Sequence, residues 1–302
     1  MRQRAPQTVT GDDSNSENLR TRNGTILLLI AATLWSLNGG LIKLLEAAGL
    51  GAGSIASFRS LVAAIFLLPF AWPRFKRLEE PIWIFATVLM FTGMCGTFVL
   101  ATTATSAANA IILQYTAPAW VFVLSPWIVK ERANPKQSIA LAVSMAAVGL
   151  IFLAQYETDL FGMLIGLLSG MVFGTQVVLF RRVRAIDPIV LAFLCCAGSG
   201  VLLLPVALLL EPIQLTVSIG GWLILTGVVQ FGFPYVIYAA GVRHVSAQLA
   251  ILIIMLEPVL NPVWTYLFHR EVPHWSTMVG GAVILCSVAY LSLSRENSSV
   301  SG

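Results

Sequence analysis

Roughly ten hydrophobic runs of 17 to 25 residues divide almost the whole chain, and they constrain its fold more than any other feature. A run of this length crosses the ~30 Å hydrocarbon core of a bilayer as an α-helix. Only 11% of the 302 residues are charged and 57% are hydrophobic, whereas about a quarter of the residues in a soluble domain are charged. We therefore expect an all-α polytopic membrane protein.

Short connections rich in Gly, Pro or charge join the spans, and none is long enough for a separate soluble domain. Residues 1–23 are polar and are expected to form a disordered cytoplasmic tail, because they cannot bury enough surface to offset the entropy of ordering. Residues 295–302 form a second cytoplasmic tail. The ten predicted transmembrane helices are 24–45, 53–72, 82–101, 106–128, 137–154, 160–180, 188–210, 218–239, 246–268 and 275–294.

Basic residues gather on one side of this predicted topology. With the N-terminus inside, 15 of the 18 Lys and Arg residues fall on the inner side, Lys43 and Arg270 fall outside, and Arg59 lies within a span. Because basic residues in short loops are retained in the cytoplasm, we expect a multi-pass protein of the cytoplasmic (inner) membrane with both termini cytoplasmic. The expected partners are the lipid bilayer and a small-molecule substrate. No basic cluster interleaved with aromatics indicates nucleic acid, and the choice between monomer and homodimer stays open.

An internal repeat divides the chain into two halves. Residues 106–131 align without a gap to residues 246–271, at an offset of 140. The identical pairs are Ser106/Ser246, Ala107/Ala247, Ala110/Ala250, Ile111/Ile251, Pro118/Pro258, Val123/Val263 and Glu131/Glu271. At an offset of 138, the pairs include Trp35/Phe173, Asn38/Gln176 and Lys43/Arg181. We therefore predict two five-helix repeats, at 24–154 and 160–294. Because five is odd, the repeats are inverted in the membrane, which is a recurring plan of secondary transporters.

The repeat ends, SAANA…TAP…KER and SAQLA…LEP…HRE, resemble the EamA family of the drug/metabolite transporter superfamily, as do LWSLNGGLIK in the first span and SFRSLVAAI in the second. The resemblance covers about 24–294. It implies a ten-helix secondary transporter with a central cavity between the repeats. It also implies a small organic metabolite as substrate, often an exported amino acid or related solute.

Glu257 lies in the middle of the ninth predicted span, where a charge costs several kcal/mol. Its side chain must therefore face protein or water, and burial disfavours the charged form of a carboxyl group. Two interpretations stay open: Glu257 contacts the substrate or couples transport to protons, or it stays protonated and hydrogen-bonds a neighbouring helix. Asn261 and Trp264 follow at i+4 and i+7, so all three residues share one helical face that suits a cavity wall.

Other polar and aromatic side chains lie deep in the predicted spans. Alone, each amide is interhelical glue worth about 1 kcal/mol or less, whereas as a set they would surround a substrate site. The candidates for the substrate cavity are Trp35, Asn38, Gln114, Tyr115, Gln176 and Gln230. Residues that could stack on an aromatic substrate are Trp35, Trp120, Trp264 and Tyr235.

Three prolines within spans are predicted helix kinks: Pro118, Pro258 and Pro262. Each removes a backbone donor and leaves a carbonyl on the preceding turn unpaired. Such carbonyls are tolerated where they line a cavity or find a neighbour. Whether the prolines line a cavity or only curve the helices stays open.

Arg59 also has two interpretations. It lies about six residues inside the outer end of its helix, close enough to snorkel to the interface. It could instead bind a substrate carboxylate bidentately. Lys43 and Arg181 are interpreted as helix-end anchors, and Glu131 and Glu271 as residues that cap loops on opposite faces.

Other classes of membrane protein lack their required residues. Intramembrane proteolysis needs a histidine base or two acids at depth, but His244, His269 and His274 fall at loops or helix ends. No GxxxxGK[ST] motif supports an ATP-driven pump. The four cysteines lack zinc-site spacing. We therefore predict no enzyme, no cofactor and no metal, and a carrier that works by alternating access. A passive channel or a structural membrane protein is the alternative.

Overall fold

The computed structural model describes a chain that is helical throughout. The described residues are 11–76, 78–104, 107–154, 160–211, 216–260, 264, 275–276, 278–284, 286–287 and 290. Among them every regular element is a helix and none is a strand. The elements are α1 (Gly11–Trp35), α2 (Asn38–Ala47), α3 (Ala52–Ala71), η1 (Trp72–Arg74), α4 (Pro81–Ala104), α5 (Ala107–Gln114), α6 (Ala117–Ile128), α7 (Pro135–Ala154), α8 (Leu160–Arg182), α9 (Pro188–Leu210), α10 (Val217–Ile224), η2 (Leu225–Gly232), α11 (Phe233–Gly241) and α12 (Ala247–Ile254).

Helices long and apolar enough to cross a bilayer make up most of this part of the chain. Within the described ranges they number six, namely Leu19–Ala47, Ala52–Arg74, Pro81–Ala104, Leu160–Arg182, Pro188–Leu210 and Val217–Gly241. Large apolar side chains cover the outside of the bundle, including Trp127 at 82% exposure and Leu209 at 79%. Such a surface needs lipid as its solvent. The chain is therefore an all-helical membrane protein, as its composition predicts.

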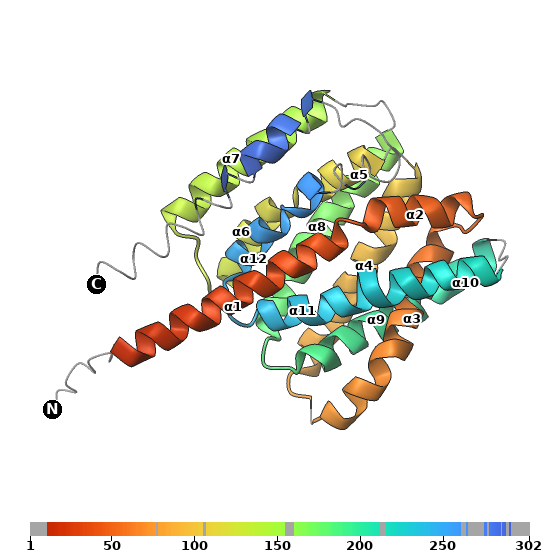
Figure 1. Cartoon of the computed structure of the whole chain (residues 1–302), viewed down its shortest axis with the longest axis horizontal. Helices are drawn as coiled ribbons and strands as arrows, with labels where there is room; N and C mark the ends of the chain where they lie inside the picture. The colour runs from red at the N-terminus through yellow and green to blue at the C-terminus, as the bar shows by residue number, and fades with distance from the viewer. Residues whose placement is uncertain are drawn as a thin grey trace.

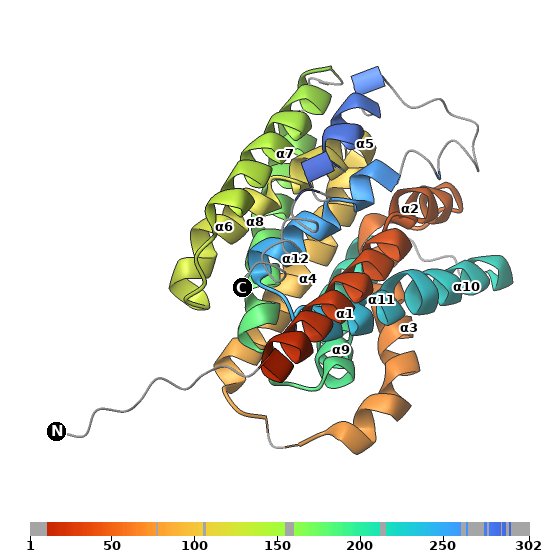
Figure 2. The ribbon, with the colours of Figure 1, turned by 60° about the vertical axis from the view of Figure 1, so that its left-hand side comes forward.

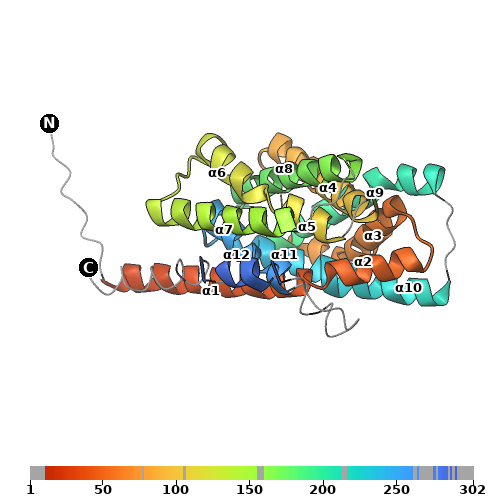
Figure 3. The ribbon, with the colours of Figure 1, turned by 90° about the horizontal axis from the view of Figure 1, so that it is seen from above.

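The helices pack across the two predicted repeats more than within them. Helix α3 runs along α9, α4 along α8 and α9, and α1 along α11 and α12. Helices α5 and α6 pack on α8, and α6 also meets α12. Helices α7 and α10 lie at opposite sides of the molecule in Figures 1, 2 and 3. The interior is therefore formed mainly by α1, α3, α4, α8, α9 and α11.

Three of the predicted spans are interrupted near their middle. Helix α1 ends before Ser36 and Leu37, α5 ends before Tyr115 and Thr116, and α12 ends before Met255 and Leu256. Each break contains the same tightened turn, closed by backbone bonds from Leu37 N to Leu34 O, from Thr116 N to Leu113 O and from Leu256 N to Ile253 O. The eighth predicted span is continuous but widens into the π-helix η2. The interior thus contains irregular backbone in four spans.

Pro118 and Pro258 begin new helical segments and do not bend continuous ones. Pro118 occupies the first turn of α6, and Pro258 follows Glu257 where the chain becomes helical again after Leu256. The first turn has no intrahelical acceptor for its N–H groups, so a proline there loses no hydrogen bond. Pro262 lies outside the described residues.

The N-terminal helix begins earlier than the sequence predicts. Helix α1 starts at Gly11, within the segment for which a disordered tail was expected. Residues 1–10 and 291–302 lie outside the described part of the chain.

Glycines on α8 let the interrupted fourth span approach closely. A Cβ atom added to Gly174 would lie 2.6 Å from the carbonyl oxygen of Ala117 and 2.7 Å from Cβ of Trp120. Because a carbonyl oxygen of the facing backbone cannot swing aside as a side chain can, the two helices would have to separate. Gly174 therefore sets the distance between α8 and the start of α6.

We expect Gly174→Ala to lower stability by about 1–3 kcal/mol, as overpacking does in a well-packed core. Gly220→Ala is the matched control, because nothing lies within 4 Å of a Cβ at Gly220 in α10. There alanine should be neutral or slightly stabilising through its higher helix propensity. Thermal unfolding of the purified protein in detergent measures both. Equal melting temperatures for the two variants would contradict the close contact.

Candidate functional site

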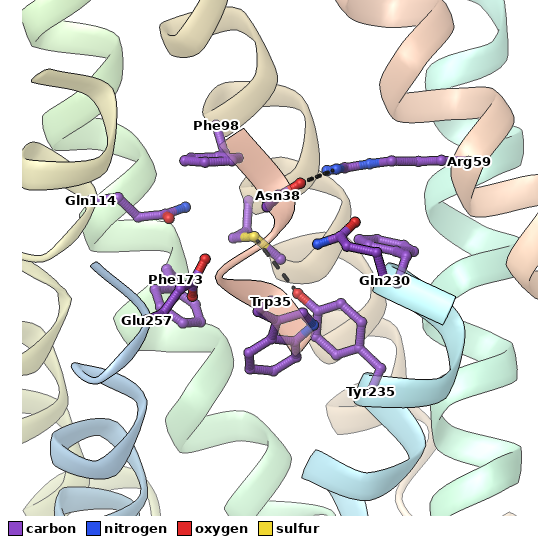
Figure 4. A pocket seen from close by; sticks show the side chains of 11 residues that line it. Trp35, Asn38, Arg59, Phe98, Gln114, Phe173, Gln230, Tyr235 and Glu257 are labelled. Atoms are coloured by element: carbon purple, nitrogen blue, oxygen red, sulfur yellow. Dashed lines mark hydrogen bonds between the residues drawn. The ribbon is translucent and has the colours of Figure 1, made fainter. Parts of the chain in front are cut away.

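A small cavity lies where the irregular helices meet (Figure 4). Its volume is about 20 Å³, which is room for about one water molecule. It is lined by Trp35, Asn38, Arg59, Met94, Phe98, Gln114, Phe173, Gln230, Phe231, Tyr235 and Glu257. A space of this size does not admit an organic solute.

The helix breaks supply the polar lining of the cavity. Trp35 and Asn38 flank the break between α1 and α2, Gln114 ends α5, and Glu257 follows the break after α12. Gln230 lies in the π-helix η2, a geometry that occurs frequently at functional sites. Irregular backbone at membrane depth is tolerated where it is buried in protein or lines a cavity. Residues beside the helix breaks therefore form much of the cavity wall.

Glu257 accepts a hydrogen bond from a residue of the other half of the chain. The Tyr115 hydroxyl donates to Glu257 Oε2 at 2.9 Å, and the two residues are 1% and 8% exposed. Both stand at the breaks of matching spans, the fourth and the ninth. Next to Tyr115, Gln114 Nε2 donates to Ser169 Oγ on α8 at 2.9 Å. The carboxyl group thus faces protein, as its depth in the span requires.

Arg59 lies on the other side of the cavity from Glu257 (Figure 4). Its side chain is 2% exposed, so it does not snorkel to the membrane interface. Nη1 donates to Asn38 Oδ1 at 2.8 Å, and the guanidinium carbon lies 4.6 Å from the centre of the Phe231 ring. The cavity therefore has a cation at one side and a carboxyl group at the other.

Several buried polar atoms of the lining have no hydrogen-bond partner within the described chain. They are Trp35 Nε1, Arg59 Nε, Gln230 Nε2 and Gln230 Oε1. Buried polar groups in native proteins are nearly always paired, so each such group needs an explanation. Further unpaired atoms lie elsewhere in the described interior, including both amide atoms of Gln176 and the Tyr238 hydroxyl. The four at the lining are those that a ligand in the cavity would satisfy.

The structure brings most of the predicted cavity residues together. Trp35, Asn38, Gln114, Gln230, Glu257 and Arg59 line the cavity, and Tyr115 reaches it through Glu257. Gln176 is fully buried but does not line it. Trp264 Nε1 donates to Ser36 Oγ at 2.6 Å, beside the first break. Asn261 lies outside the described residues.

Apolar lining residues are the part that sequence inspection does not find. Met94, Phe98 and Phe231 lie within long apolar runs that carry no distinguishing pattern. Phe173 is an exception, because the repeat pairs it with Trp35, which also lines the cavity. Trp120, a candidate for stacking, is 38% exposed and lies outside the lining.

A second polar cluster joins the two halves at one end of the bundle. A surface hollow of about 600 Å³ lies at this end, lined by four basic residues (Arg74, Lys76, Arg182 and Arg243) and three acidic ones (Glu79, Glu80 and Asp187). We call this end the basic face. There Arg181 Nε donates to Glu131 Oε1 at 2.7 Å, and the Ala247 N–H donates to Glu131 Oε2 at 3.1 Å. Gln248 Nε2 donates to the Glu131 carbonyl oxygen at 3.2 Å. We call Glu131, Arg181, Ala247 and Gln248 the Glu131 cluster.

The described residues contain no group of three or more His, Cys, Asp or Glu side chains that could hold a metal ion. Cys95, Cys195 and Cys196 are free and buried.

Interrupted helices around a buried polar cavity are typical of membrane transporters. The model of the EamA-like transporter family matches residues 22–153 and again residues 160–293. The chain therefore belongs to the EamA-like transporter family, with one copy of the family unit in each half.

Relatives in other organisms are also transporters by name. The chain is 27% identical over 238 residues to an uncharacterized transporter of Archaeoglobus fulgidus, covering 78% of this chain and 84% of the relative. It is 26% identical over 288 residues to the pseudopaline exporter CntI of Pseudomonas aeruginosa, covering 91% and 96%. A solved crystal structure superposes with a TM-score of 0.76 at 17% identity, covering 91% of this chain and 98% of that one, which shows a shared fold.

We expect Tyr115→Phe to lower stability by about 1–3 kcal/mol, because it leaves a buried carboxyl oxygen without its donor. Tyr238→Phe is the matched control. Tyr238 is fully buried, and its hydroxyl has no hydrogen-bond partner among the described residues. Its loss should be neutral or stabilising. Thermal unfolding of both variants in detergent checks the difference, and an equal loss of stability would contradict the importance of the Tyr115–Glu257 bond.

Proposed function

We propose that this protein is a secondary transporter that moves a small organic metabolite, such as an amino acid or a related solute, across the cytoplasmic membrane by alternating access. The observation that carries the proposal is the central cavity, which Arg59 and Glu257 line from opposite sides. The helices around it are interrupted near the cavity. Transport in the direction of export is supported by the relative named as an exporter. The protein is proposed to have no enzymatic activity and no cofactor.

Two inverted five-helix repeats, with ten spans in all, are part of the proposal. The packing supports this symmetry, because exchanging the halves exchanges observed contacts. The pair α4–α8 becomes α11–α1, and the pair α4–α9 becomes η2–α3. The central pair α3–α9 maps onto itself, and its members carry Pro69 and Pro205 at matching positions. A two-fold axis in the membrane plane accounts for all of these contacts together.

Alternating access is supported by the contracted cavity and by the closed basic face. A site of about 20 Å³ needs a conformational change before it can admit a solute. The Glu131 cluster holds the fourth span of one half against the sixth and ninth spans of the other. The basic face is proposed to be cytoplasmic, together with both termini, because short basic loops are retained inside. The structure then corresponds to a state closed toward the cytoplasm.

Glu257 is proposed to couple transport to protons. It stands at a helix break, and its bond to Tyr115 crosses from one half to the other. A carboxyl group so placed can give up its hydrogen bond from the tyrosine hydroxyl and bind a proton or the ammonium group of a solute in its place. Gain or loss of the proton would then change the contact between the halves.

Reconstituted protein in liposomes should show saturable counterflow of at least one solute from a panel of labelled amino acids and small carboxylates. We expect Glu257→Gln to reduce transport at least about tenfold and to remove its pH dependence, because the amide cannot exchange a proton. Glu46→Gln is the control, since within the described ranges the ion pair of Glu46 is with Lys43 of its own helix, at 3.0 Å. Passive, non-saturable flux for every solute contradicts the carrier. Normal transport by Glu257→Gln at every pH contradicts proton coupling through Glu257 but leaves the carrier proposal in place.

We expect Glu131→Gln to open the basic face, because the amide lacks the charge that pairs with Arg181 and has one acceptor oxygen where the carboxylate uses two. The reporter is a cysteine at Met94 of the cavity, placed in a chain whose four native cysteines are replaced by serine. A membrane-impermeant thiol reagent applied at the basic face should label it about fivefold faster in Glu131→Gln, because a partly exposed ion pair contributes about 1 kcal/mol. Glu46→Gln should not change the rate. Equal labelling rates in all three proteins would contradict a gating role for the Glu131 cluster.

A further inference from the structure

We propose that Arg59 forms an anion subsite of the cavity, which binds the carboxylate of the transported solute. The inference rests on the proposed function in one respect, namely that the central cavity is where the solute binds. It goes further by assigning a required chemical group to the solute and a defined place for it. Three properties of Arg59 carry it: its burial, its missing counter-ion and its free hydrogen-bond donor.

Arg59 is a buried cation with no anionic partner among the described residues. The described ion pairs are Lys43–Glu46, Arg181–Glu131 and Arg182–Glu80, all of them partly exposed. Arg59 itself contacts three uncharged groups, namely the Asn38 amide, the face of the Phe231 ring and the Cys95 thiol. Glu257, the acid that shares the cavity, is hydrogen-bonded to Tyr115 and forms no ion pair with Arg59. Burying a charge without a counter-ion is costly, so such a residue is retained where a function requires it.

Three residues that line the cavity carry buried donors without a partner. Arg59 Nε, Trp35 Nε1 and Gln230 Nε2 are buried and have no acceptor within the described chain. Asn38 and Phe231 hold the guanidinium from its Nη1 end and from one face. The Nε edge therefore stays available, and a guanidinium edge pairs with the two oxygens of a carboxylate through parallel hydrogen bonds. One carboxylate can thus satisfy donors that the protein leaves unpaired.

The rest of the lining indicates what the carboxylate is attached to. Phe98, Phe173 and Tyr235 present aromatic surface to the same cavity. The matching position of the second half carries Cys195 in place of Arg59, so the subsite belongs to one half alone. A solute with a carboxylate at one end and an apolar body would match this arrangement.

Binding to the purified full-length protein tests the subsite without requiring transport. The probes are 3-phenylpropionate, its neutral amide 3-phenylpropanamide, and phenyl phosphate. A ligand that binds the folded state raises the melting temperature, and the rise grows with the logarithm of its concentration divided by its Kd. We expect 3-phenylpropionate to stabilise the wild type at concentrations at least about tenfold lower than the amide requires, because only the anion answers the buried cation. Equal effects of the acid and the amide would overturn the subsite, and a preference for phenyl phosphate would overturn its assignment to carboxylates.

Variants at Arg59 separate a binding role from a structural one. Arg59→Met should abolish the preference for the acid and leave the ligand-free protein as stable or more stable, because a buried unpaired charge has been removed. Arg59→Lys keeps the charge without the planar fork and should weaken the preference. Arg182→Gln is the control, since it removes an arginine that is paired with Glu80 outside the cavity. If Arg59→Met does not fold, the comparison of acid and amide in Arg59→Lys decides.

A preference for the acid that survives in Arg59→Met or stays full in Arg59→Lys would overturn the proposal. The outcomes also distinguish this inference from the transport function. Protein that binds the acid through Arg59 but exchanges no solute would contradict the carrier and leave the subsite in place. Saturable exchange that does not depend on Arg59 would support the carrier and contradict the subsite.

Discussion

The rest of this structure depends on the requirement that backbone polar groups inside a membrane be satisfied within the protein. A regular helix meets the requirement through its own backbone hydrogen bonds. An interrupted helix needs neighbouring protein or a cavity to satisfy the backbone groups at the break. In this protein the breaks after Trp35, Gln114 and Ile254 do not face lipid but meet at one buried place, together with the widened turn of η2. The same concentration of irregular backbone frees side chains to point inward. One constraint thus explains both the shape of the interior and the position of its polar residues.

The two ionisable side chains of the cavity are each held by uncharged groups. The two ionisable side chains of the cavity differ in how they are held, since Glu257 has a tyrosine donor and Arg59 has a neutral amide and an aromatic face. Neither neutralises the other through a direct ion pair. Such an arrangement is less stable than an apolar core of the same shape would be. It is suited to a site that receives charged groups from a solute, where the unmet interactions of the protein become binding interactions.

The connection between the cavity and the ends of the bundle runs through a few short elements. Tyr115 stands at the start of the segment that ends in Ile128, and Glu131 follows directly after it. The other partner of both residues is the chain between Ser246 and Glu257, which begins with the N–H group capped by Glu131 and ends with the carboxyl group bound by Tyr115. The segments 115–131 and 246–257 thus contact each other both beside the cavity and at the basic face.

The sequence by itself determined the class of fold, because long apolar runs have one stable solution in lipid, and it determined the pairing of the halves, because the repeat is written in matched residues. It also identified Glu257, Gln114, Asn38 and Gln230 as polar residues at depth, since each stands out in an apolar run. The tertiary structure alone decided which of them share a cavity. It placed Gln176 away from the lining. It also brought Arg59 of the second predicted span and Gln230 of the eighth to the same cavity. The break at Ser36 carries no proline. Which residues share the cavity depends on packing between distant segments, and such packing leaves no local pattern in the sequence.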